Sequence, residues 1–168
     1  MIRISPPPKD SLKELQQVIH QFHNRINPPR AQNMLDKNIA GLFAALLSRH
    51  GIPNQFHKLK RRAKATLPII LALKLYYNRD RPQEYADKLN IPIKFDYLKS
   101  AQTRSYPSGH STQAYYLAIK LSKKYPKLKP KLFRLAHAIS SSRMDRGVHY
   151  PSDLDGGYEL AMILSKIF

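Results

Sequence analysis

The sequence predicts an all-α fold, a single-domain bundle of about six to seven helices. Apolar residues recur at spacings of three and four in most segments, and residues typical of helix starts and ends separate these segments. No segment shows the alternation of apolar and polar residues expected of a half-buried strand. With 168 residues, 42% of them hydrophobic, and no stretch of linker composition, the chain is expected to form one domain over residues 1–168.

Local signals place each helix in order. Ser11 and Glu14 match the S-x-x-E pattern of a capping box, so the first helix is expected to run from Ser11 to about Ile26. The second is expected over 31–50, ended by Gly51, and the third over 56–80, with a kink at Pro68. Four more are expected over 84–89, 108–124, 131–142 and 151–167.

The charge balance indicates an anionic partner. Twenty-nine Lys and Arg residues against eleven Asp and Glu give a formal charge of +18, which attracts nucleic acid, acidic membrane surfaces or phosphorylated small molecules. The sequence has no cysteine, which excludes disulfides and thiolate metal sites. The first residues lack the apolar stretch of a signal peptide, and the longest apolar run, Leu67–Leu73, is far shorter than the roughly 20 residues of a membrane span. A cytoplasmic, soluble protein, at most peripheral to a membrane, is therefore expected.

The first of three unusual polar segments runs from Lys74 to Pro82. Lys74 and Arg81 are seven residues apart, so on one helix both would project from the same face, about 10 Å apart along the axis. Two cations on one face repel each other unless an anion lies between them. The alternative is that both side chains extend from a buried helix into solvent.

The second segment is Ser105–Ser111. Ser108 is a suitable N-cap for the helix that follows, and Gly109 would let an anion approach the first backbone N–H groups closely. His110 would lie in the first turn, where it can donate a proton to a leaving oxygen. The alternative is an ordinary N-cap followed by an exposed histidine.

The third segment is Ser142–Asp153. Arg143 offers a fork of donors that matches phosphate oxygens, and His149 lies just before Pro151, a favoured first residue of a helix. Asp153, four residues after His149, can accept the Nδ1 proton and leave Nε2 as a nucleophile. The alternative is that Asp153 only complements the helix dipole. Asp145 and Arg146 of this segment are expected at the rim or in solvent.

Together the segments read Lys74-x6-Arg81-Pro82, Pro107-Ser108-Gly109-His110 and Ser142-Arg143-x5-His149-x3-Asp153. In order, spacing and fixed residues this pattern resembles the signature of the type 2 phosphatidic acid phosphatase (PAP2) superfamily, in its soluble acid-phosphatase-like form. That superfamily includes bacterial class A acid phosphatases, lipid phosphate phosphatases and vanadium haloperoxidases. The three blocks span about half of the chain.

The resemblance implies a helical bundle and a set of roles. His149 would attack phosphorus to form a phosphohistidine, Asp153 would orient His149, and His110 would protonate the leaving group and then activate water. The phosphoryl oxygens would be held by Lys74, Arg81, Ser108, Gly109 and Arg143. The resemblance implies no metal and no cofactor, and a substrate that is a phosphomonoester or small diphosphate, lipid and isoprenoid phosphates included. An optimum on the acidic side of neutral is expected, because His110 must be protonated while His149 is not.

Two basic clusters, 57–64 and 123–134, are either solvated helix faces or a docking surface for anionic lipid or nucleic acid. The pairs Tyr76-Tyr77 and Tyr115-Tyr116 are predicted to be core or pocket wall rather than a platform for nucleic-acid bases. The alternatives to a phosphatase are a basic nucleic-acid-binding protein on the same scaffold and a vanadate-dependent haloperoxidase. The physiological substrate and the oligomeric state, a dimer included, stay open.

Overall fold

The computed structural model describes residues 2–26 and 29–168, and these form nine α-helices, two short 3-10 helices and no strand. The predicted all-α fold is confirmed. The helices are α1 (Leu12–His23), α2 (Pro29–Lys37), α3 (Ile39–Ser48), α4 (Phe56–Ala65), α5 (Leu67–Tyr77), α6 (Pro82–Lys88), α7 (Gly109–Lys124), α8 (Lys129–Asp145) and α9 (Pro151–Ile167), with 3-10 turns at Lys99–Ala101 and Pro126–Leu128.

Two of the predicted helices are each divided in two. The segment 31–50 breaks at Asn38, which leaves helical geometry and whose side chain accepts a hydrogen bond from the Gly41 N–H at 3.0 Å, capping α3. The segment 56–80 breaks at Thr66, two residues before Pro68, because a proline lacks the N–H for the helical ladder and its ring crowds the preceding turn. The second part ends early, at Asn78, which has a φ of 46°. The number of helices therefore exceeds the prediction although each predicted helical segment is present.

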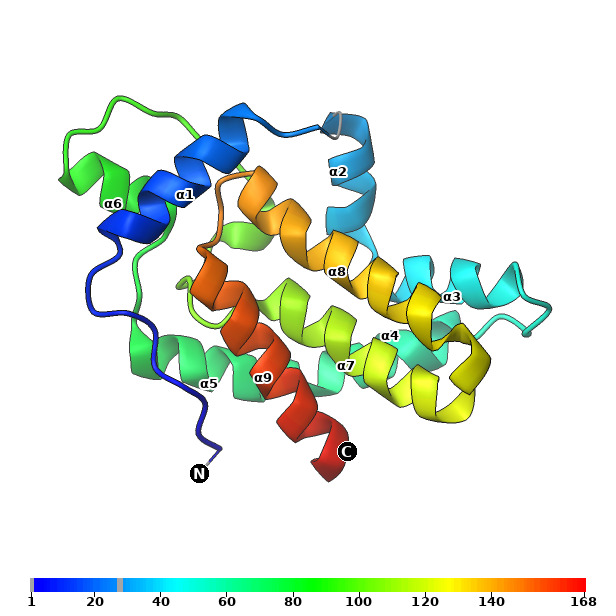
Figure 1. Cartoon of the computed structure of the whole chain (residues 1–168). Helices are drawn as coiled ribbons and strands as arrows, with labels where there is room; N and C mark the ends of the chain where they lie inside the picture. The colour runs from blue at the N-terminus through cyan, green and yellow to red at the C-terminus, as the bar shows by residue number, and fades with distance from the viewer. Residues whose placement is uncertain (1, 27–28) are drawn as a thin grey trace.

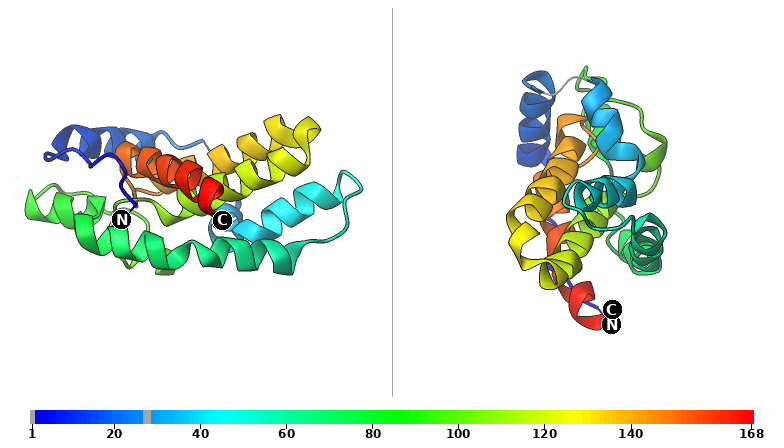
Figure 2. Two further views of the ribbon diagram at one scale, coloured as in Figure 1. Left: turned by 90° about the horizontal axis from the view of Figure 1, so that it is seen from below. Right: turned by 90° about the vertical axis from the view of Figure 1, so that its right-hand side faces the viewer.

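Helix α7 lies at the centre of the fold. It contacts α8 and α9 on one side and α3, α4 and α5 on the other, as Figure 1 and the left view of Figure 2 show. Its buried apolar side chains, such as Leu117 and Leu121, join one core with α3, α8 and α9. A second, smaller core holds α1 against α6 and the segment before α9, through Leu15, Ala86 and Tyr150.

Glycines let the start of α9 approach the start of α7. A Cβ atom on Gly157 would lie 2.8 Å from the Ser108 carbonyl oxygen, and one on Gly156 would lie 2.4 Å from the Tyr106 hydroxyl. Only a residue without a side chain fits at such separations. This close packing is reinforced by a backbone hydrogen bond of 2.9 Å from the Ser108 N–H to the Asp153 carbonyl oxygen. It holds the second and third polar segments together.

The tyrosine pairs differ from one another in burial. Tyr116 is a core residue, and Tyr77 is half-buried with its hydroxyl donating to the Ile4 carbonyl oxygen at 2.7 Å. Tyr76, in contrast, is 72% exposed, so its predicted place in the core or in a pocket wall was wrong. The reason is that α5 packs on the fold through Ile70, Leu73 and Lys74, and Tyr76 lies beyond the edge of this buried face.

No helix formed by residues 2–26 and 29–168 combines the length and the apolar character needed to cross a membrane.

Candidate active site

His149 and Asp153 form a buried pair at the start of α9. The Nδ1 atom of His149 lies 2.9 Å from Oδ2 of Asp153, and both side chains are almost completely buried. Helix α9 begins at Pro151, as predicted, which puts Asp153 in the first helical turn and one turn beyond His149. A carboxylate at Nδ1 keeps the proton on that nitrogen, so the lone pair of the neutral ring lies on Nε2.

The carboxylate of Asp153 is held from several directions. Its Oδ2 atom also accepts hydrogen bonds from the Tyr150 N–H at 3.0 Å and from the Ser105 hydroxyl, and its Oδ1 atom accepts one from Arg79 at 2.7 Å. The backbone closes the same network, since the Ser105 N–H donates to the Arg79 carbonyl oxygen at 2.9 Å. The orientation of Asp153, and through it that of His149, is therefore determined by three separate chain segments.

Arg79 connects this pair to helix α1. Its guanidinium donates to Glu14 Oε2 at 2.5 Å and to the Ser11 hydroxyl at 2.9 Å, and its Cζ atom lies 4.0 Å from the centroid of the Tyr150 ring. Glu14 in turn accepts from the N–H of Ser152 at 2.7 Å, which caps α9. The predicted capping box at Ser11 and Glu14 was therefore wrong, because neither side chain caps α1. The hydroxyl of Ser11 and the carboxylate of Glu14 bond to the buried Arg79 guanidinium, a stronger partner than the backbone N–H groups of α1.

Lys74 and Arg81 meet at the site from different elements. Lys74 lies in α5, whereas Arg81 follows the break at Asn78 and precedes α6, so the prediction of one shared helix face was wrong. Lys74 Nζ donates to the carbonyl oxygens of Arg104 and Ser105, the latter at 3.0 Å. Arg81 donates to the carbonyl oxygens of Thr103 and Val148, each at 2.6 Å, and lies 3.3 Å from His149 Nε2.

Lys74 and Arg81 are buried near other cations, and both effects lower their pKa values. Burial, followed by the charge of Arg81, lowers the pKa of Lys74 to about 7. Burial, followed by the charge of Arg143, lowers the pKa of Arg81 to about 10. Clustered buried cations of this kind are stabilised by a bound anion.

Arg143 and His110 share a carboxylate that the sequence did not reveal. Arg143, in α8, donates to Oδ1 of Asp36 and to the Ser100 hydroxyl, the latter at 3.2 Å. His110 Nε2 lies 3.1 Å from the same Asp36 oxygen and 3.0 Å from the Asp36 carbonyl oxygen. Burial would raise the pKa of Asp36, but the hydrogen bond from His110 and the charge of Arg143 together hold it far below its usual range. Asp36 is therefore a carboxylate between the two residues.

Both histidines are disfavoured in their charged form, to different degrees. Burial, then the charges of Arg81, Lys74, Arg143 and His110, hold the pKa of His149 well below its ordinary value. Burial and then Arg143 lower the pKa of His110, whereas Asp36 opposes that shift. The lowered pKa keeps the His149 ring neutral despite its contact with Asp153, whereas Asp36 supports the protonated form of His110 against burial.

The start of α7 has the geometry that was predicted. Ser108 is the N-cap, and its hydroxyl accepts a hydrogen bond from the Ser111 N–H at 3.3 Å. Gly109 is the first residue of the helix, and a Cβ atom there would make only an ordinary contact of 3.6 Å with Ile70. Packing against the described side chains therefore does not require glycine at position 109, and the space there is open to a ligand.

Asp145 and Arg146 are buried, so their predicted position at the rim or in solvent was wrong. Asp145 accepts from the Gln21 amide at 2.7 Å, and Arg146 donates to Asp96 at 2.9 Å and to Asn33 at 2.7 Å. These contacts connect α1, α2 and the 91–104 loop to the end of α8. The sequence did not show this, because each partner is distant along the chain.

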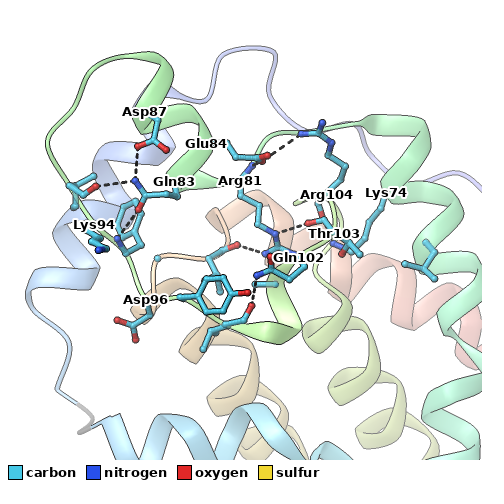
Figure 3. A pocket seen from close by; sticks show the side chains of 18 of the residues that line it. Lys74, Arg81, Gln83, Glu84, Asp87, Lys94, Asp96, Gln102, Thr103 and Arg104 are labelled. Atoms are coloured by element: carbon cyan, nitrogen blue, oxygen red, sulfur yellow. Dashed lines mark hydrogen bonds and ion pairs between the residues drawn. The ribbon is translucent and has the colours of Figure 1, made fainter.

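A cavity of about 1010 Å³ adjoins the site (Figure 3). Lys74, Arg81 and Arg104 lie on one side of it, and Gln83, Asp87, Lys94 and Asp96 on the other. The walls are largely apolar and come from α5 and the 91–104 loop, with Leu71, Leu75, Ile93, Phe95, Tyr97 and Leu98 among the lining residues. A ligand with a phosphate at the cations and an apolar portion in the cavity fits this arrangement.

Sequence reasoning missed four residues of the site: Glu14, Asp36, Arg79 and Ser105. Arg79 lies two residues before Arg81, and Ser105 lies two residues before Pro107, but their contacts with Asp153 can be seen only in the folded structure. Asp36 is 107 positions from Arg143, and nothing in the local pattern of α2 distinguishes it from a solvent-exposed acid.

Comparisons with known proteins agree with the motif pattern. The model of the PAP2 superfamily matches residues 63–168. An acid phosphatase of Zymomonas mobilis subsp. mobilis is 28% identical over 110 residues, which are 66% of this chain and 41% of that protein's length. A transmembrane PAP2 type phosphatidylglycerolphosphate phosphatase from Bacillus subtilis superposes with a TM-score of 0.59 over 92% of this chain and 82% of that chain, at 19% identity, a likeness of fold. With the family model covering more than half of the sequence, the chain belongs to the PAP2 superfamily.

Proposed function

We propose that this chain is a phosphatase that hydrolyses phosphomonoesters or small diphosphates through a phosphohistidine at His149. The observation that carries the proposal is the pair of contacts made by the His149 ring. Asp153 Oδ2 lies 2.9 Å from Nδ1, while Nε2 lies 3.3 Å from the Arg81 guanidinium. The nucleophilic nitrogen is thereby aimed at a cation that would hold the oxygens of a phosphoryl group.

In the first step the Nε2 lone pair attacks phosphorus and the bond from phosphorus to the ester oxygen breaks. His110 gives its proton to that oxygen, and the alcohol leaves. In the second step neutral His110 takes a proton from water, whose oxygen attacks the phosphohistidine. The N–P bond breaks, its electron pair returns to Nε2, and inorganic phosphate is released. Asp153 keeps the Nδ1 proton in place throughout, and the chemistry uses no metal and no cofactor.

Lys74, Arg81, Ser108, Gly109 and Arg143 would bind the phosphoryl oxygens. An ammonium group has three N–H donors, and two of those on Lys74 are used by carbonyl oxygens, which leaves a third for the substrate. Arg143 Nε is buried and has no hydrogen-bond partner among residues 2–26 and 29–168. A phosphate oxygen would supply that missing acceptor, which is costly to leave absent in a buried site.

The apolar cavity beside the cations supports a substrate with an apolar portion, such as a lipid or isoprenoid phosphate. Along a series of alkyl phosphates of increasing chain length, kcat/KM should rise until the chain fills the cavity, by about 4-fold for each buried methylene group. A charged residue in the wall, as in Leu75→Glu, should remove this dependence while leaving turnover of a short phosphomonoester nearly unchanged.

Turnover of p-nitrophenyl phosphate by the parent protein and by His149→Ala tests the proposal. The parent should be active and inhibited by vanadate, and the variant inactive. A parent protein that is inert but binds DNA or RNA in a salt-sensitive way would favour the nucleic-acid-binding alternative. Vanadate-dependent oxidation of bromide or chloride in place of hydrolysis would favour the haloperoxidase.

A further inference from the structure

The outward face of α5 is apolar along its whole length. Its exposed residues are Leu67, Pro68, Leu71, Ala72, Leu75 and Tyr76. Leu75 is 78% exposed and Tyr76 72%. A helix on the surface of a protein in water ordinarily turns polar residues outward, and a contiguous exposed apolar face marks an interaction surface.

Helix α4, which precedes α5, turns cations outward instead. Its exposed side chains include His57, Lys58, Lys60, Arg61 and Lys64. The two helices run end to end along one side of the molecule (Figure 2, left). Thr66 between them has helical backbone angles, and its carbonyl oxygen accepts from the Ile70 N–H at 3.1 Å, so the helical path continues across the break.

The cationic and apolar faces therefore lie in line. Exposed positions 57, 61, 64, 68, 71 and 75 follow one another at steps of four and three, the spacing that keeps side chains on one face of a helix. We propose that this α4–α5 face binds the surface of an anionic lipid bilayer. The apolar residues of α5 would enter the boundary between headgroups and acyl chains, and the cations of α4 would meet the lipid phosphates.

Charge and position favour a bilayer over a second copy of the chain. Each copy carries a formal charge of +18 and a row of cations beside the apolar face, so two copies would repel each other. Leu71 and Leu75 belong to the α5 face and also line the cavity beside Lys74. A bilayer on this face would thus lie directly at the entrance to the cavity.

Flotation of the full-length protein with phosphatidylcholine vesicles, with and without phosphatidylglycerol, tests the docking surface directly. The parent should bind the vesicles that contain phosphatidylglycerol, and binding should weaken as salt is added. The triple variant Lys58→Gln/Arg61→Gln/Lys64→Gln should bind them about 100-fold more weakly. The double variant Leu67→Ser/Tyr76→Ser, which changes the apolar face outside the cavity, should bind at least about 10-fold more weakly.

Matched variants elsewhere serve as controls. Lys123→Gln/Lys124→Gln/Lys127→Gln removes the same charge from the exposed end of α7 and the turn that follows, and Ile167→Ser/Phe168→Ser removes exposed apolar side chains at the end of α9. If these controls lose binding as much as the α4–α5 variants, binding is a matter of total charge and hydrophobicity, and the proposal is overturned. Loss of binding in none of the variants, or a parent dimer that dissociates in Leu67→Ser/Tyr76→Ser, would overturn it too.

The vesicle readout involves no catalysis, so it can fail or succeed independently of the proposed phosphatase activity. Turnover of a soluble phosphomonoester by the docking variants reports whether they are folded, since the substituted residues lie outside the site. Unchanged turnover with lost flotation is the expected combination. Unchanged flotation in folded variants would mean that the bilayer binds elsewhere.

Discussion

The guanidinium of Arg79 lies 2.7 Å from Oδ1 of Asp153, on the carboxylate oxygen opposite the one that bonds to His149. The same guanidinium is bonded to Glu14, and Glu14 caps α9 through Ser152. A chain of charged groups thus runs from the surface helix α1 to the predicted nucleophile. The orientation of His149 thus depends on Arg79, which fills a variable position between Lys74 and Arg81, and on Glu14, which lies outside the three motifs.

Replacing Arg79 should impair turnover more than binding. Without its donor at Oδ1, Asp153 is less firmly oriented, and the loss of one charge-assisted hydrogen bond of about 1.5–3 kcal/mol corresponds to a fall of about 10- to 100-fold in kcat. Arg79→Gln should therefore lower kcat for p-nitrophenyl phosphate and change KM little. Arg25→Gln, which removes a partly exposed ion pair with Asp96, is the matched control and should remain near parental activity. A rise in KM alone would place Arg79 among the groups that bind the substrate.

Asp36 should set the alkaline side of the pH profile. His110 must be protonated to act as an acid, and Asp36 works against the burial and the Arg143 charge that lower the pKa of His110. Asp36→Asn removes that opposition, so the pKa of His110 should fall further, and kcat/KM should decline at a lower pH than in the parent. The fall in kcat/KM at low pH, which depends on the protonation of His149, should shift less.

A control for charge is Asp155→Asn, which removes one exposed carboxylate of α9 and should leave the profile where it was. If Asp36→Asn instead lowers KM with an unchanged profile, Asp36 competes with the substrate for Arg143 and does not support the protonated form of His110.

Lys74 should make phosphate binding depend on pH near neutrality. With a pKa of about 7 in the absence of ligand, Lys74 loses its charge as the pH rises through that value, and its attraction for the phosphoryl oxygens is lost with it. The inhibition constant of sulfate, an analogue of phosphate that stays a dianion throughout this range, should therefore rise between about pH 6.5 and 8.5. Lys74→Met should bind sulfate weakly at every pH in that range. If the inhibition constant of Lys74→Met changed with pH as steeply as that of the parent, the titrating group would be a residue other than Lys74.

Glu14 should be a stabilising residue as well as part of the charged network. Its side chain is 12% exposed and that of Arg79 7%, so removing the carboxylate leaves a buried cation with one partner fewer. Breaking such a pair costs about 3 kcal/mol, or about 6–12 °C of melting temperature for a chain of this size. Glu14→Ala should show that loss in thermal unfolding. Glu84→Ala, which removes a carboxylate that is 52% exposed, should lose far less, and equal losses would contradict the importance of the buried pair.

The order of the helical segments and the start of α7 and α9 could be predicted because each depends on signals within a few residues. Ser108 before Gly109 and Pro151 before Asp153 are local patterns, and the fourfold spacing of His149 and Asp153 is the geometry of one helical turn. The three motifs could also be recognised from the sequence alone, because they are defined by the order and spacing of their residues.

The remaining features depend on contacts between distant segments. Glu14 matched a capping pattern, yet Arg79, 65 positions away, offers a stronger partner than the backbone of α1 does. Asp145 and Arg146 are buried and Asp36 is partly buried, each bonded to a partner from another helix. Local pattern assigns such residues to the surface, because the cost of burying a charge is offset only by partners that the tertiary structure supplies.

The measurement that tests the central claim most directly is the trapping of the covalent intermediate. The parent protein and His110→Ala are mixed with a phosphomonoester labelled with ³²P, quenched with alkali within milliseconds, and digested for peptide mapping. The label should be found on His149, should be stable in base and labile in acid as a phosphoramidate is, and should be absent from His149→Ala. Label on another residue, or an active parent that never acquires label in the burst phase, would contradict a mechanism in which His149 is the nucleophile.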